Sequence, residues 1–233
     1  MFSLDLNIIK ELLEETLPSY QATCKDTDNL GFGFLFYSIA RNIRPEKTIV
    51  IGSKAGFSVI CFALGIKDNE GHTIKTVNCY DTELANPKVK PTLHFIDPSF
   101  SHEKEDKNHW YGIGFWDNEM EVENHWRKFG VSEFVKHFKV TSQDYLNHKE
   151  ALGDVDLLYI DGDHSYEGIS HDFNEYHKIL KQNAIIVTHD VDPVLKEFDS
   201  ETGGFQAFCD LDRNKFEVFR LPIYPGLALV RKL

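Results

Sequence analysis

The chain has 233 residues with a formal net charge of −12, and 42% of its residues are hydrophobic. This length and apolar content can form the core of one α/β domain, so they exclude a chain that is mostly disordered. The acidic excess argues against a nucleic-acid partner, because proteins neutralise phosphates with clustered Lys and Arg. No apolar run reaches about 18 residues, the length that spans a bilayer, so we expect no membrane partner.

The cysteines and the N-terminus bear on where the protein works. The four cysteines are scattered and none pairs in a CxxC motif, which fits neither a disulfide framework nor a cysteine zinc site. The first residues interleave acids with apolar side chains and lack the basic region of a signal peptide. Both features favour a cytoplasmic protein.

Two helices are expected before the first strand. Apolar residues at steps of three and four between Leu6 and Leu17 predict an amphipathic helix that Pro18 ends. Residues 31–43 predict a second, more buried helix. The first helix could pack on its own domain or on a second subunit, so the sequence leaves a homodimer open.

Residues 45–233 predict the core of a single domain over residues 1–233, after a helical N-terminal segment at 1–44. A β-branched run at 48–51, a glycine turn and a helical stretch to Leu64 are typical of the opening of a doubly wound sheet. Continuous apolar runs indicate strands covered on both faces, as in a parallel sheet. Such runs occur at 92–96, 138–141, 157–160 and 184–188. The predicted fold class is α/β, with a three-layer, doubly wound, Rossmann-like sheet that is mostly parallel.

Other segments complete the predicted fold. Residues 216–220 and 227–231 predict an antiparallel hairpin at one edge of the sheet, and an apolar stripe over 166–180 predicts the helix before the fifth strand. Residues 68–91 look like an insertion before the second strand. Residues 99–118 are polar but rich in aromatic rings, so we interpret them as a loop that forms a lid or a partner surface.

Polar residues or glycines follow four of the predicted strands, and ligands of open α/β sheets bind at the carboxyl ends of strands. Each group alone also has a structural interpretation, as a tight turn, a turn before proline, a helix cap or the entry to a loop. Their shared location at one edge of the sheet favours a binding site. The groups are Gly52 with Ser53, Asp97, Asp161 to His164, and His189 with Asp190.

The glycine turn and the acid after the second strand suit a nucleotide-like ligand. Gly52 and Gly56 would let the backbone approach a ligand, and the helix that follows has a partly positive N-terminus. A carboxylate at the end of the second strand is where such sheets hold a ribose diol. Asp97 is one candidate, and Asp81, after an alternative strand at 74–80, has the spacing closer to a dinucleotide motif.

The last two strand ends carry a candidate catalytic cluster. Asp161, His189 and Asp190 should meet, because a right-handed crossover puts both carboxyl ends at the same edge of the sheet. Carboxylates with one imidazole suit Mg, Mn or similar cations. The same groups could instead hold substrate or cofactor without a metal.

Together these segments resemble the class I S-adenosylmethionine (SAM)-dependent methyltransferases. The nearest branch is methyltransferase family 24, which is related to macrocin-type sugar O-methyltransferases. The stretch LYIDGDHSYE at 158–167 is the most specific part of the resemblance. The other parts are IVIGSKAGFS at 49–58, FIDPS at 95–99, IIVTHD at 185–190 and PGLALV at 225–230.

The resemblance implies a cofactor and roles for individual residues. The methionine part of SAM would lie against Gly52, Ser53, Gly56 and Ser58. Asp97 would bind its ribose, and Ser142 with Gln143 would lie near its adenine. Asp161 matches an aspartate that contacts the cofactor and binds metal or acts as a base in related O-methyltransferases, with His189 and Asp190 at the partner positions.

The sequence departs from the family pattern at two places. Val50 stands where the glycine motif usually carries a glutamate. His189 and Asp190 stand where many metal-using relatives carry two acids, or an aspartate and an asparagine. The first departure bears on cofactor affinity, and the second bears on the use of Mg or Mn.

Three functions are compatible with these residues. The favoured one is a SAM-dependent methyltransferase that acts on an oxygen of a small-molecule acceptor, with Asp161, His164 or His189 taking the acceptor's proton. The second is a metal-dependent hydrolase or phosphotransferase in which the same acids and histidines activate water. The third is a non-catalytic member of the fold that binds a nucleotide-like ligand or a protein partner.

Overall fold

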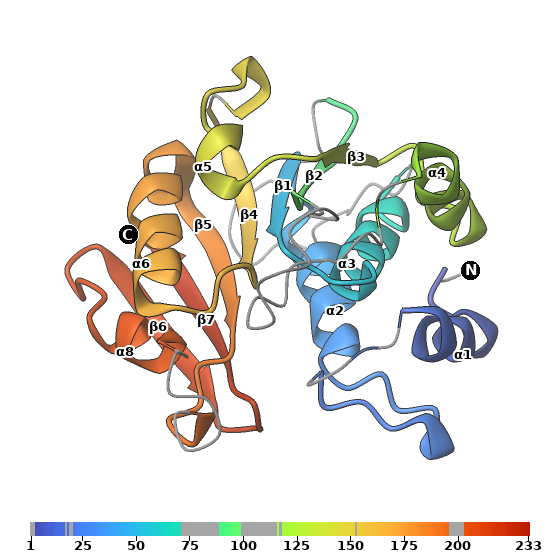
Figure 1. Cartoon of the computed structure of the whole chain (residues 1–233), viewed down its shortest axis with the longest axis horizontal. Coiled ribbons are helices and arrows are strands. Elements are labelled where there is room, and N and C mark those ends of the chain that lie inside the picture. The colour runs from blue at the N-terminus through green and yellow to red at the C-terminus, as the bar shows by residue number, and fades with distance from the viewer. Residues whose placement is uncertain are drawn as a thin grey trace, which may run out of the picture.

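A single sheet lies at the centre of the structure, which is a computed structural model. It describes residues 3–16, 18, 21–70, 89–98, 116, 118–151, 153–195 and 203–233. In these residues seven strands follow the order β3-β2-β1-β4-β5-β7-β6 (Figure 1). Strands β1 to β5 are parallel, and β7 runs antiparallel between β5 and β6. The strands are β1 (Lys47–Ile51), β2 (Thr92–Ile96), β3 (Val135–Phe138), β4 (Val155–Ile160), β5 (Leu180–His189), β6 (Phe216–Leu221) and β7 (Leu227–Lys232). The α/β class and the C-terminal hairpin are confirmed.

Helices cover both faces of this sheet (Figure 1). One face carries α1 (Leu6–Glu15), α2 (Phe32–Ile43), α3 (Phe57–Lys67) and α4 (Glu119–Lys128). The other carries α5 (Ser142–Tyr145), α6 (Tyr166–Tyr176) and α8 (Gly204–Cys209). Alternate strand residues enter the two cores: Val50 packs in the first layer, whereas Ile49 and Ile51 pack in the second. This two-sided burial explains the continuous apolar runs in the sequence.

The third strand begins three residues earlier than the sequence predicted. We expected residues 138–141, but β3 covers Val135–Phe138 and pairs with β2 from Leu93 onward. The hydroxyl of Thr141 accepts a hydrogen bond from the Asp144 N–H (3.0 Å) and so caps the start of α5. This cap draws the chain out of the sheet before residue 141.

The apolar stripe over 166–180 is not one helix. Helix α6 ends at Tyr176, a 3₁₀ turn covers His177–Ile179, and Leu180 is the first residue of β5. Strand β5 therefore starts four residues before the expected 184–188, because Leu180 already pairs with Val155 of β4. Periodicity could not separate these elements, since Leu180 is buried as a helix residue at that spacing would be.

Helix α4 was not predicted, because its mostly polar sequence buries a single side chain, Trp126. The proposed insertion (68–91) and the aromatic loop (99–118) lie mostly outside the described residues, as does Asp81. No helix in the described ranges is long and apolar enough to cross a membrane.

A buried carboxyl joins α6 to the start of α5. Asp172 is 2% exposed, and its Oδ1 atom has no hydrogen-bond partner. Burial raises the pKa of Asp172 to about 7, although a hydrogen bond from Ser142 acts in the opposite direction. Nearby, the Tyr176 hydroxyl donates to the Ser142 carbonyl (2.7 Å). The folded protein therefore keeps a proton on Asp172 that the unfolded chain loses near pH 4.

We predict that Asp172→Asn changes the pH dependence of stability. Because the folded-state pKa is raised, the stabilising contribution of the protonated carboxyl is complete below about pH 4 and is lost as the pH rises through 7. The asparagine stays neutral, so the variant should exceed the wild type by about 1–3 kcal/mol in free energy of unfolding at pH 8. Urea denaturation between pH 5 and pH 8 measures this. The control is Glu167→Gln, an exposed acid on the same helix; equal slopes for wild type and Asp172→Asn would contradict the prediction.

Candidate active site

The turn between β1 and α3 brings the two central strands together at the carboxyl edge of the sheet. Gly52 has φ +69°, and a Cβ atom at this position would lie 2.2 Å from the backbone oxygen of Asp161. The Asp161 N–H donates to the Ile51 carbonyl (2.9 Å), and the Gly52 N–H donates to the Ile96 carbonyl (3.0 Å). Only glycine fits this close approach. It fixes Asp161 beside the turn that the sequence predicted to hold a cofactor.

The second glycine of the turn has a different environment. Gly56 has φ +84°, and a Cβ atom there would lie 2.9 Å from the Trp126 indole and 3.1 Å from the Trp116 indole. The two indoles are stacked, with ring centroids 5.1 Å apart. On the side where a Cβ atom would point, the space beside Gly56 is filled by these two rings; the predicted approach of a ligand to its backbone stays a prediction. Both the left-handed φ and the two indoles therefore require glycine at this position.

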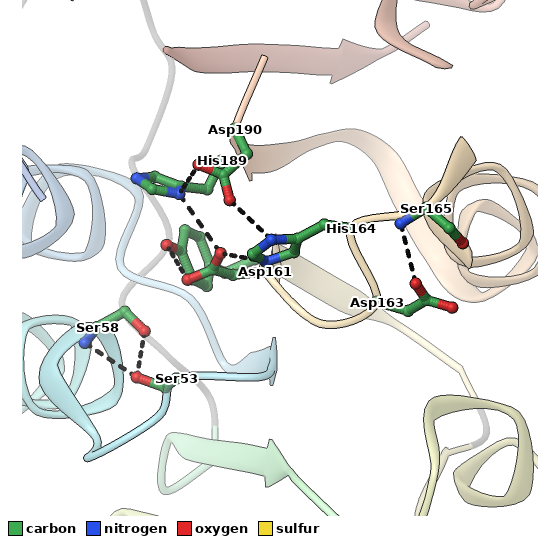
Figure 2. Close-up of polar contacts among 9 residues, drawn as sticks. Ser53, Ser58, Asp161, Asp163, His164, Ser165, His189 and Asp190 are labelled. Carbon is green, nitrogen blue, oxygen red and sulfur yellow. Dashed lines mark hydrogen bonds and ion pairs between the residues drawn. The ribbon is translucent and has the colours of Figure 1, made fainter. Parts of the chain in front are cut away.

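Ser53, in this turn, and Ser58, in the first turn of α3, bond to each other (Figure 2). Their hydroxyl oxygens are 2.6 Å apart, and the Ser58 N–H donates to the Ser53 hydroxyl (3.1 Å). Both residues are buried. This pair ties the first turn of α3 to the end of β1, so it stabilises the loop in which the sequence predicted a methionine-binding role.

Asp97 follows β2 at the same edge of the sheet and is 5% exposed. Its N–H donates to the Phe138 carbonyl (3.2 Å), and its own carbonyl lies 3.3 Å from Nε2 of His137. Ser142 and Gln143 open α5 after β3; Ser142 is half-buried and Gln143 is exposed. The residues predicted for ribose and adenine thus follow adjacent strands.

Four residues after β4 and β5 form one polar group, which we call the Asp–His cluster: Asp161, His164, His189 and Asp190. Nδ1 of His189 lies 3.4 Å from Oδ1 of Asp161 and 3.0 Å from Oδ1 of Asp190. His164 bridges the same acids through Nε2 (3.4 Å to Asp161) and Nδ1 (3.1 Å to Asp190). Figure 2 shows Asp161 between the two imidazoles. The structure therefore places these predicted residues together.

The electrostatics of the Asp–His cluster favour charged forms. Burial alone would raise the pKa of Asp161, but the charge of His189 and a hydrogen bond from His164 outweigh it and hold this pKa well below its usual range. Desolvation would lower both histidine pKa values. The acids reverse this effect and raise the pKa of His164 to about 9 and that of His189 to about 10. We expected a histidine that titrates near neutrality; here both imidazoles carry a proton at neutral pH.

Burial separates the two histidines. The side chain of His189 is 2% exposed, and its ring meets the edge of Phe32 at 5.8 Å. The side chain of His164 is 45% exposed and reaches the open side of the cluster. Asp163 and Ser165 serve α6 instead, since Asp163 accepts from the Ser165 N–H (2.9 Å) and Ser165 caps the helix through the Gly168 N–H (3.0 Å).

The Asp–His cluster has donors suited to a cation. Asp161, His164 and Asp190 each offer one ligand atom, and these atoms lie within 4.8 Å of one another in the described part of the chain. We predicted His189 as the nitrogen ligand, and its Nδ1 atom also contacts both acids. Carboxylate oxygens with one imidazole fit Mn²⁺ or a similar ion. The residues present therefore fit a divalent metal: His164 belongs to the set within 4.8 Å, and the predicted His189 contacts both acids.

Sequence reasoning missed three residues that support these groups. Tyr159 is fully buried and donates its hydroxyl to Oδ2 of Asp161 (2.9 Å). Nε2 of His125 lies 3.1 Å from the Ala55 carbonyl in the glycine turn. His137 contacts Asp97 as described above. Tyr159 lies in the 158–167 motif but was given no role of its own, and the two histidines lie in segments without a recognised motif.

The strand order, with β7 antiparallel between β5 and β6, and a family match together identify a class I SAM-dependent methyltransferase. Residues 49–191 match the model of methyltransferase family 24, described as a methyltransferase domain. The chain belongs to this family. No curated protein matched the chain in a sequence comparison.

Solved structures share the fold over nearly the whole chain. An O-methyltransferase from Bacillus cereus, in complex with S-adenosylhomocysteine (SAH), has a TM-score of 0.64 and 12% identity over 97% of this chain and 91% of that chain. The O-methyltransferase TomG from Streptomyces achromogenes, involved in tomaymycin synthesis and bound to SAM, has a TM-score of 0.60 and 15% identity over 97% and 88%. An SAH-bound methyltransferase from Podospora anserina has a TM-score of 0.59 and 17% identity over 97% and 88%. At these identities the likeness shows a common fold.

We predict that Gly52→Ala destabilises the protein and disturbs the glycine turn. A methyl group would lie 2.2 Å from the Asp161 carbonyl, so the ends of β1 and β4 must separate. The free energy of unfolding in urea should fall by about 2–4 kcal/mol. Gly153→Ala is the matched control, because Gly153 has a similar φ of +73° but nothing within 4 Å of the added methyl. Equal losses in the two variants would show that backbone strain, and not the contact with Asp161, accounts for the effect.

Proposed function

We propose that this protein transfers a methyl group from SAM to an oxygen atom of a small-molecule acceptor. The observation that carries the proposal is the placement of Asp161. A close backbone contact holds it against the glycine turn, and two histidines and a second acid surround its carboxylate. The family and the O-methyltransferases with the same fold support the reaction class.

Three turns of the chain would bind different parts of the cofactor. Gly52, Ser53, Gly56 and Ser58 form the turn proposed for the methionine part. The buried Asp97 carboxylate would accept hydrogen bonds from the ribose hydroxyls. Ser142 and Gln143 would flank the adenine, while Asp161 would contact the cofactor from β4. When bound, SAM supplies a methyl group activated by its sulfonium, so the protein's task is to position the acceptor and remove its proton.

His164 is the proposed general base, with Asp161 and His189 as its partners. It is the more exposed imidazole of the Asp–His cluster, so it can reach an acceptor at the open side. The acids on either side orient its ring through both nitrogens. The same acids raise its pKa to about 9 and contact both of its nitrogens. His164 would therefore act as a base only after it gives one proton to solvent and one of these contacts opens.

A divalent cation is the proposed second component of this site. Asp161, His189 and Asp190 would hold Mg or Mn, which leaves His164 to act as the base. Such an ion would supply Lewis acidity to the acceptor oxygen. Tyr159 would orient Asp161 toward the ion, since it already binds the other carboxylate oxygen.

Calorimetry with SAM and SAH tests cofactor binding. Asp97→Ala should weaken binding by about 1–3 kcal/mol, which is a rise in Kd of about 5- to 150-fold, because hydrogen bonds to a charged carboxylate are lost. Asp81→Ala should leave the Kd unchanged. The reverse order would assign the ribose to Asp81, and absence of binding in the wild type would refute the proposed function. Binding without SAH release over a panel of hydroxylated small molecules would favour a non-catalytic role.

The metal proposal has a separate test. EDTA should abolish methyl transfer, and Mg or Mn should restore it. Asp190→Ala should lower the transfer rate at least tenfold more than it weakens SAM binding, because Asp190 contacts the histidines and lies outside the glycine turn. Full activity in EDTA would show that the Asp–His cluster acts without metal.

A further inference from the structure

A block of stacked rings lies beneath the glycine turn and the end of β2. We call it the aromatic block: Phe95, Trp116, His125, Trp126 and His137. The Phe95 and His137 rings stack at 4.7 Å with planes 22° apart, and the two indoles stack at 5.1 Å with planes 20° apart. Trp116 contacts His137 at 5.5 Å and His125 at 5.8 Å. Each ring therefore contacts at least one other, and the five rings pack as one unit.

Each histidine of the aromatic block contacts a main-chain carbonyl in a different proposed cofactor turn. Nε2 of His125, from α4, lies 3.1 Å from the carbonyl of Ala55, which precedes Gly56. Nε2 of His137, from β3, lies 3.3 Å from the carbonyl of Asp97. These carbonyls belong to the turns proposed for the methionine part and for the ribose. The aromatic block thus contacts both turns, through one histidine each.

The surroundings of both imidazoles favour the neutral form with a hydrogen on Nε2. Burial lowers the pKa of His137 to about 4, and burial also lowers the pKa of His125. A neutral imidazole can donate to a carbonyl only from the nitrogen that carries its hydrogen. Two such donors, fixed by ring stacking, would hold both carbonyls against rotation of their peptide planes. A phenylalanine could fill the same volume but could not donate.

We propose that His125 and His137 are positioning residues for SAM, which hold the glycine turn and Asp97 at the separation that the cofactor requires. This inference rests on the proposed function. Part of the affinity for SAM would then come from two histidines that do not contact the cofactor. Because one block carries both contacts, loss of either should loosen the same pair of turns.

The test compares cofactor affinity with thermal stability in matched variants. His137→Phe should raise the Kd for SAH about tenfold, the cost of one hydrogen bond, and His125→Phe should act similarly. His137→Gln can donate from a terminal amide, so it should recover most of the affinity. His94→Phe is the control, because His94 is also buried and has a pKa lowered to about 4, but it bonds to the Tyr145 hydroxyl on the other face of the sheet. It should lower Tm without changing the Kd.

The outcomes separate this inference from the proposed function. A wild type that does not bind SAH overturns both. If the wild type binds SAH and both Phe variants bind it equally well, the proposed function stands and the positioning role is wrong. An equal rise in Kd for His94→Phe would also overturn the positioning role, because the effect would then follow general destabilisation. If His137→Phe does not fold, His125→Phe and His137→Gln decide the question by the same Kd measurement.

Discussion

The contact between Gly52 and the backbone of Asp161 determines the rest of the site. Strands β1 and β4 stay paired to their ends only because no side chain separates them at this point. The same contact brings the glycine turn, the Asp–His cluster and the end of β2 to one edge of the sheet, where the Gly52 N–H also bonds to the Ile96 carbonyl. The proposed site, which takes groups from the ends of four strands, thus depends on one residue without a Cβ atom.

The Asp–His cluster balances its charges within the protein. The carboxylates of Asp161 and Asp190 have oxygens within 4.8 Å of each other and would repel. Each imidazole contacts both acids, and both histidine pKa values are raised. A bound cation would compete with these protons for the same oxygens. The protonated imidazoles therefore explain how the two acids remain close to each other.

The sequence predicted the fold best where a strand is buried on both faces and is followed by a glycine or a polar residue. The boundaries of β2 were predicted to the residue, and the meeting of Asp161 with His189 and Asp190 followed from the right-handed crossover alone. Prediction failed where side-chain hydrogen bonds or tertiary packing decide: the Thr141 cap ended β3 early, and Leu180 joined the sheet instead of α6. The proposed roles of His125 and His137 could not be predicted from the sequence, because an isolated histidine becomes informative only when its neighbours in space are known.

The stacked indoles have an optical consequence. The chain contains three tryptophans, and Trp116 and Trp126 both lie against Gly56 in the glycine turn. Indole emission is sensitive to the local field and to nearby motion, so a change in the turn alters the environment of two of the three emitters at once. The protein therefore carries a built-in fluorescent reporter of the proposed cofactor turn, without any added label.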